Sequence, residues 1–115
     1  MQRGEIRMVD LDPTRGSEAS KARPAVVVSN DAANTVVTRL GRGVVTVVPV
    51  TSNVERIYPF QVLLLAVASG LPRDSKAPAE QVRSVAVARV GRQCGAMTVA
   101  LMRELDEALR VHQSL

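Results

Sequence analysis

Residues 3–30 have the sequence RGEIRMVDLDPTRGSEASKARPAVVVSN, in which a polar loop separates two apolar runs. The runs IRMVDL and AVVVS are typical of strands, because short apolar stretches bounded by turn residues form buried strands. Asp12-Pro13 and Gly16-Ser17 lie between the runs and are turn formers that prefer surface positions. The stretch therefore predicts two strands that present a binding loop at the surface.

Arg23 stands where the second apolar run begins, directly before Pro24. A proline restricts the preceding residue to an extended conformation, so the backbone of Arg23 is partly fixed. Its planar guanidinium carries five N–H donors and suits a phosphate group. Arg23 is therefore a candidate phosphate-binding residue, although an arginine at a strand start is more often a solvated charge or an ion-pair partner.

The composition suits one small domain, because the chain has 115 residues of which 46% are hydrophobic. Cys94 is the only cysteine, which excludes an intrachain disulfide and fits a reducing cytosol. No charged and apolar leader opens the chain, and its longest apolar stretch, residues 62–68, has seven residues. A membrane-spanning helix needs about 20, so we expect a soluble, cytoplasmic protein that does not associate with a membrane.

The charge balance favours a polyanionic partner. Fifteen Lys and Arg against eleven Asp and Glu give a net charge of +4, and most of the basic residues are arginine, which forms forked contacts with phosphate. Tyr58 and Phe60 are the only aromatic residues. Stacking of bases on a row of rings therefore cannot be the main mode of binding.

Short apolar runs, punctuated by Gly, Pro and Ser, predict a compact β-rich domain. Between Asp31 and Leu40 the pattern favours a short helix, capped by Asn30 or Asp31. The expected strands span residues 5–11, 25–29, 44–50, 60–65, 75–77 and 81–85.

A longer helix is expected near the C-terminus, where Thr98 can cap apolar residues at helical spacing, namely Leu101, Met102, Leu105, Ala108 and Leu109. Its exposed face is expected to combine Arg103 with Glu107 and Asp106 with Arg110. Strands followed by one packing helix indicate a mainly β fold with α-helix (α+β). We expect a curved sheet or small SH3-like β-barrel with a C-terminal helix, in a single domain of residues 1–115.

The titratable residues narrow the possible chemistry. A metal site needs a cluster of His, Asp, Glu or Cys, but the only histidine is His112 near the end of the chain and the carboxylates are scattered. We therefore expect no metal and no cofactor. With one histidine, the chain cannot be a ribonuclease that uses a pair of histidines. A Ser-His-Asp hydrolase would have to use His112 as its catalytic histidine. An arginine-centred mechanism remains, in which the protein supplies charge and hydrogen-bond donors for an anionic transition state and no nucleophile of its own.

Three motifs follow one another along the chain: VDLDPTxGSE with RPAVVVSN, then VPVTS, then EQVRS. Together they resemble the MazF/PemK family of toxin endoribonucleases over nearly the whole length. The resemblance implies an SH3-like barrel and a metal-independent, sequence-specific endoribonuclease that leaves 2′,3′-cyclic phosphate and 5′-hydroxyl ends. It also implies a homodimer that cleaves single-stranded RNA (mRNA, with rRNA and tRNA as further candidates). A cognate antitoxin, whose disordered acidic tail folds into the groove at the dimer interface, would inhibit it.

The resemblance places Arg23 and Thr51 at the reaction centre and adds Ser17, Ser52, Asn53 and Gln81 as RNA-binding residues. A guanidinium is a poor base near neutrality, so charge stabilisation is the role we assign to Arg23. Without the resemblance, the hydroxyls of Thr51 and Ser52 would be assigned to closing a turn. Glu80 and Arg83 are expected to form an internal supporting pair.

Two other classes of protein stay open from the sequence alone. One is a gyrase-poison toxin, which shares the barrel but acts through an aromatic C-terminus, whereas this chain has no tryptophan and ends VHQSL. The other is a non-catalytic RNA-binding barrel. Such a protein would bind RNA with a salt slope of about −0.7 per phosphate contact and would not cut it.

Overall fold

The computed structural model describes residues 1–12 and 21–115. Among the helices of these residues, none combines the length and the apolar character needed to span a bilayer. The elements are, in chain order, β1 (Glu5–Asp12), β2 (Lys21–Val27), α1 (Asp31–Leu40), β3 (Val44–Pro49), β4 (Gln61–Leu64), α2 (Ala66–Ser69), β5 (Ser75–Pro78), the 3₁₀ turn η1 (Ala79–Gln81), β6 (Arg83–Ala86), the 3₁₀ turn η2 (Val87–Arg89), β7 (Val90–Ala96) and α3 (Val99–Gln113).

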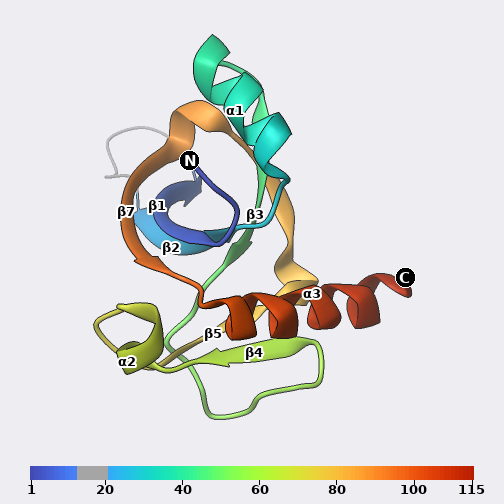
Figure 1. Cartoon of the computed structure of the whole chain (residues 1–115). Coiled ribbons are helices and arrows are strands. Elements are labelled where there is room, and N and C mark those ends of the chain that lie inside the picture. The colour runs from blue at the N-terminus through green and yellow to red at the C-terminus, as the bar shows by residue number, and fades with distance from the viewer. Residues whose placement is uncertain (13–20) are drawn as a thin grey trace.

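The strands form two antiparallel sheets. The larger sheet has the order β6-β3-β2-β1-β7, and β4 pairs with β5 in the smaller one. Figure 1 shows the larger sheet curling strongly, with α1 at its top and with β4, β5 and α3 along its lower side. The predicted mainly β, barrel-like α+β fold with a C-terminal helix is confirmed.

The central strands of the larger sheet, β2 and β3, are buried on both faces. On β2, Val26 belongs to a core cluster shared with β4, β5 and α3, whereas Ala25 belongs to a second cluster. On β3, Val48 joins the first cluster and Val47 joins the second. Successive side chains of a strand point to opposite faces, so a strand buried on both faces needs an unbroken apolar run. This explains the consecutive valines Val26-Val27 in β2 and Val47-Val48 in β3.

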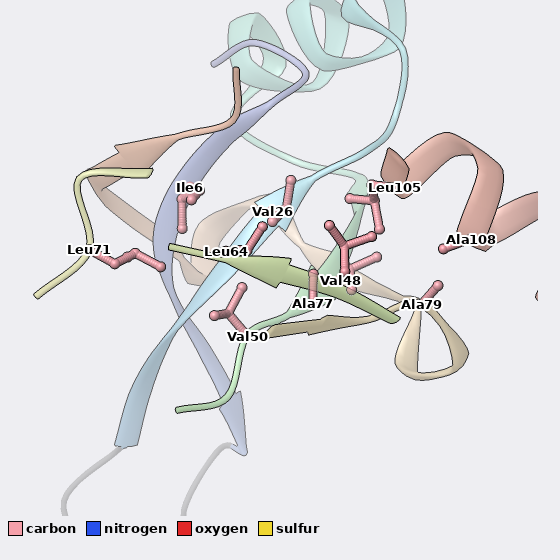
Figure 2. Packing of buried hydrophobic residues seen from close by; sticks show 11 residues of the cluster. Ile6, Val26, Val48, Val50, Leu64, Leu71, Ala77, Ala79, Leu105 and Ala108 are labelled. Carbon is pink, nitrogen blue, oxygen red and sulfur yellow. The ribbon is translucent and has the colours of Figure 1, made fainter. Parts of the chain in front are cut away.

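The first cluster joins the C-terminal helix to the two sheets. Leu105 of α3 is fully buried, and Ala108 is 3% exposed. Figure 2 shows both side chains extending from α3 into the cluster, to which Val48 of β3 and Leu64 of β4 also contribute. The apolar face that the sequence predicts for this helix therefore serves to hold the small sheet against the large one.

Side-chain caps begin both long helices, as predicted. The Oδ1 atom of Asn30 accepts the N–H of Ala33 at 2.8 Å, which selects Asn30 over Asp31 as the cap of α1. The hydroxyl oxygen of Thr98 accepts the N–H of Leu101 at 3.1 Å at the start of α3. These contacts satisfy backbone donors that the first turn of a helix leaves unpaired.

The expectation that Asp106 shares an exposed face with Arg110 is wrong. Asp106 is half-buried, and its carboxylate pairs with the guanidinium of Arg3. The Nε atom of Arg3 also donates to the carbonyl of Val28 at 2.8 Å. Arg3 therefore joins α3 to the segment that follows β2, a contact between residues far apart in the sequence.

Strand β7 was not among the predicted elements. Its sequence, VGRQCGA, has two glycines and no apolar alternation, which are the features that weaken a strand signal. At Gly95 a Cβ atom would lie 2.6 Å from the carbonyl oxygen of Ser69 in α2. Glycine is thus needed where β7 passes the backbone of α2. Because a glycine inside a strand weakens its sequence signal, the strand could not be predicted from the pattern of apolar residues.

The buried position of Leu105 leads to a stability prediction. Leu105→Ala should lower the free energy of unfolding by about 2–5 kcal/mol, because it removes buried methyl groups and leaves a cavity in the first cluster. Leu115→Ala is the matched control, since Leu115 is 84% exposed. Urea denaturation followed by circular dichroism measures both variants. Equal stability of the two would contradict the assignment of α3 to the core.

Candidate functional site

The pairing of β2 with β3 brings Arg23 and Thr51 together. Ala25 pairs with Pro49, and the N–H of Val50 donates to the carbonyl of Pro24 at 2.9 Å. When this antiparallel register is continued beyond the ladder, Thr51 falls across from Arg23. Residues directly opposite in an antiparallel pair project to the same side, so the hydroxyl and the guanidinium share one face.

Strand β5 holds Thr51 from the other side. The N–H of Thr51 donates to the carbonyl of Lys76 at 3.0 Å, and the N–H of Lys76 donates back to the carbonyl of Thr51 at 2.8 Å. This bridge joins the small sheet to the end of β3. Because both backbone groups of Thr51 are paired, its side chain is presented from a fixed position.

The loop after β3 uses side chains to turn. The hydroxyl oxygen of Thr51 accepts the N–H of Asn53 at 3.2 Å, and the Oδ1 atom of Asn53 accepts the N–H of Glu55 at 3.3 Å. Such local bonds are the turn-closing role expected of hydroxyl and amide side chains. A hydroxyl that accepts one bond still has its proton to donate, so Thr51 can also bind an anionic oxygen.

A pocket of about 300 Å³ lies at this point, and its described lining comprises Arg23, Pro24, Val50, Thr51, Ser52, Leu71, Pro72, Arg73 and Ser75. None of these residues is acidic and two are arginines, so the lining carries positive charge. Val50 and Leu71 belong to the first core cluster. The pocket thus has rigid apolar walls beneath its polar rim, as binding sites for organic ligands generally do.

Neither arginine of the pocket has an acidic partner among the side chains that the structure describes, those of residues 1–11 and 22–115. There, the ion pairs within 4.0 Å join Arg3 to Asp106 and Arg7 to Glu5. Both Arg23 and Arg73 are exposed. Two guanidiniums that line one cavity and form no ion pair with a described carboxylate attract an anionic ligand.

The other predicted contacts lie apart from this pocket. Ser52 lines it, but Asn53 and Gln81 do not, and both of these are exposed, on the loop after β3 and on η1. Ser17 lies outside the described residues. The structure therefore gathers Arg23, Thr51 and Ser52 at one place and leaves Asn53 and Gln81 on separate segments.

The expected pair of Glu80 and Arg83 is wrong. The Oε2 atom of Glu80 accepts the Nε2–H of Gln61 at 2.8 Å instead, and the Oε1 atom of Gln61 accepts the Nζ–H of Lys76 at 3.1 Å. Arg83 is exposed at the start of β6. The partner of Glu80 comes from β4, which lies beside η1 in the fold but is distant from it in sequence.

The remaining reactive side chains do not line the described wall of the pocket. His112 lies in the last turn of α3, and Cys94 lies on β7. Burial raises the pKa of the Cys94 thiol, against the opposing charges of Arg92 and Arg7. The thiol is therefore protonated near neutrality and is not poised as a nucleophile. Among the described residues, no three of His, Cys, Asp and Glu are grouped to hold a metal ion.

Comparison with known proteins identifies the family of this chain. Residues 2–112 match the family described as PemK-like, MazF-like toxin of type II toxin-antitoxin system. The chain is 62% identical to endoribonuclease MazF9 of Mycobacterium tuberculosis, over 100% of this chain and 98% of that protein. It is 42% identical to endoribonuclease toxin MazF of Escherichia coli K12, over 72% of this chain and 66% of that protein.

Solved structures lead to the same family. M. tuberculosis toxin MazF-mt6 superposes with a TM-score of 0.75 at 28% identity, covering 96% of this chain and 97% of that one. A MazE-MazF crystal structure from Deinococcus radiodurans gives a TM-score of 0.78 at 26% identity, covering 100% and 96%. From its sequence and its fold alike, the chain belongs to the PemK-like, MazF-like family of toxins of type II toxin-antitoxin systems.

Proposed function

We propose that this chain is an endoribonuclease toxin that cleaves single-stranded RNA without a metal ion and is neutralised by a cognate antitoxin. The proposal rests on one observation. The pairing of β2 with β3 places Arg23 opposite Thr51, and both residues line a positively charged pocket. The names of the relatives from M. tuberculosis and E. coli support the activity, and they favour it over a gyrase poison or a non-catalytic RNA-binding barrel.

In the proposed reaction, the ribose 2′-hydroxyl attacks the adjacent phosphorus while the bond from phosphorus to the 5′-oxygen breaks. The products are a 2′,3′-cyclic phosphate and a 5′-hydroxyl, which takes up the proton that the 2′-oxygen releases. Negative charge gathers on the non-bridging oxygens during attack. Arg23 stabilises this charge as a permanent cation, and Thr51 donates a hydrogen bond to one of the oxygens.

The surrounding polar residues extend the site. Ser52 shares the pocket and offers a hydroxyl to phosphate or ribose. Asn53 and Gln81 are exposed outside the pocket, where their amides can give and accept hydrogen bonds with the edges of unpaired bases. Ser17 is proposed as a further RNA contact on the basis of the VDLDPTxGSE motif alone.

The proposed partners follow from the same chemistry. A pocket lined by two arginines attracts acidic side chains as well as phosphates, so an extended acidic antitoxin segment can compete with RNA. Solved complexes of MazE with MazF, such as that from D. radiodurans, support an antitoxin partner. We further propose that residues 1–115 form a single domain that acts as a cytoplasmic homodimer on mRNA, rRNA or tRNA.

Cleavage assays test the activity. We expect the purified protein to cut unstructured RNA in the presence of EDTA, and we expect Arg23→Ala to reduce the rate by about 10²-fold or more, as loss of an oxyanion-stabilising donor does. The ends should be 2′,3′-cyclic phosphate and 5′-hydroxyl, which phosphatase and kinase treatment distinguishes.

Arg39→Ala is the matched control for this assay. It also removes an exposed arginine, but from the last turn of α1, which follows the other end of β2. Its rate should equal that of the wild type. If a folded wild-type protein leaves diverse RNA sequences uncut, or if EDTA abolishes cutting, the proposed reaction is wrong.

The hydroxyl of Thr51 gives a separate prediction. Thr51→Val keeps the shape of the side chain but has no hydroxyl, so it should lose about 10²-fold in rate. Thr51→Ser keeps the hydroxyl and should retain most of the activity. Single-turnover cleavage rates measure both variants, with circular dichroism as a check of folding. Equal rates for the two variants would show that Thr51 acts through its shape alone.

A further inference from the structure

Arg73 is the one charged residue of the described pocket lining that none of the three sequence motifs includes. It lies on the loop between α2 and β5. Arg23 and Thr51 come from other segments of the chain, β2 and the residues that follow β3. Accepting the RNA-cleaving function proposed above, we propose that Arg73 is a positioning residue that binds the phosphate next to the scissile one. It would thereby fix the RNA strand across the pocket.

The loop that carries Arg73 is held at several points. The side chain of Leu71 is 5% exposed and lies in the first core cluster. The Oδ1 atom of Asp74 accepts the N–H of Ala66 at 2.8 Å, and the hydroxyl of Ser75 donates to the carbonyl of Arg73 at 3.0 Å. The backbone on both sides of Arg73 is therefore anchored, which is the condition for aiming a long side chain reproducibly.

The charges around Arg73 point to an anion from outside the protein. The neighbouring carboxylate, that of Asp74, accepts the N–H of Ala66 and makes no ion pair within 4.0 Å with the described side chains of residues 1–11 and 22–115. Arg23, the second cation of the pocket, repels Arg73 rather than pairing with it. An exposed arginine usually pairs with a nearby carboxylate or with water. Two arginines facing one apolar-walled cavity instead match a ligand with repeated negative charges.

RNA has this property, because each nucleotide adds one phosphate. The pocket volume of about 300 Å³ accommodates a short part of a strand and no folded RNA element. Arg23 and Thr51 serve the phosphate that reacts. Arg73 projects from a different segment, so we assign to it the adjacent phosphate of the same strand. Its contact is made equally before and during the reaction, and its loss should weaken binding rather than slow the chemical step.

Binding of an uncleavable RNA tests this assignment. The probe is a fluorescent oligoribonucleotide containing the sequence that the wild type cuts, with a 2′-deoxy nucleotide at the scissile position to remove the nucleophile. Anisotropy measured over a range of salt concentrations gives Kd. We expect Arg73→Ala to raise Kd about tenfold or more, since a hydrogen bond to a charged group is lost. The slope of log K against log salt should become shallower by about 0.7, while kcat on cleavable RNA stays close to the wild-type value.

A neutral methylphosphonate placed on either side of the scissile phosphate identifies the partner of Arg73. At one of the two positions, the substitution should weaken binding to the wild type and have no further effect in Arg73→Ala, because both changes remove the same contact. Arg73→Lys keeps the charge without the planar fork and should bind with intermediate affinity. Arg39→Ala should match the wild type in Kd and in salt slope.

Three results would overturn the proposal. They are an unchanged Kd and salt slope in Arg73→Ala, a loss of kcat without a change in Kd, and a methylphosphonate effect that adds fully to the Arg73→Ala effect at both positions. A wild-type protein that binds RNA but never cuts it would refute the proposed function instead. In that event the Kd comparison, made on an unstructured RNA, would still decide whether Arg73 binds an RNA phosphate.

Discussion

The register between β2 and β3 is the constraint on which the site depends. It is fixed next to the site by the hydrogen bond from the N–H of Val50 to the carbonyl of Pro24. Pro24 and Pro49 have no N–H, so the ladder can end here and the strands can part around a pocket. Side chains alternate between faces, so a slip of one residue would turn Arg23 away from Thr51. The valines on both faces of the sheet oppose such a slip, because each is buried in its own cluster.

Much of the fold was accessible from the sequence because it rests on local patterns. Unbroken apolar runs predicted the central strands, and the helix starts at Asn30 and Thr98 followed from side chains that cap within three residues. The missing parts depend on contacts between distant segments. The glycine in strand β7 is explained only by the close approach of α2 to Gly95 in the folded protein. The ion pair of Arg3 with Asp106 joins the two ends of the chain. No periodicity within one element encodes either contact.

The residues of the candidate site likewise fall into those that local sequence predicts and those that only tertiary packing brings to the pocket. Arg23 precedes a proline at a strand, and Thr51 follows a buried strand, so the motifs could nominate both residues and the structure places them at one pocket. Arg73 has no such local context, because the short helix before its loop was not predicted and the loop reaches the pocket only through tertiary packing. Glu80 shows the converse error: a nearby charge in the sequence was taken as its partner, whereas the structure provides the amide of Gln61.

Lysine and arginine side chains near the pocket have different roles, and the chemistry of the ammonium and guanidinium groups explains the difference. Lys76 donates its ammonium protons to the carbonyl of Arg56 at 2.8 Å and to the Oε1 atom of Gln61 at 3.1 Å, so it joins the loop after β3 to β4. A compact ammonium with three rotatable donors suits this structural role. Arg23 and Arg73 are exposed and line a pocket whose wall includes the core residues Val50 and Leu71. A guanidinium is less strongly hydrated than an ammonium, so it loses less on entering such surroundings and keeps a planar fork for phosphate. A lysine at either pocket position would retain the charge but lose that geometry, which is why the two residues cannot be regarded as interchangeable basic groups.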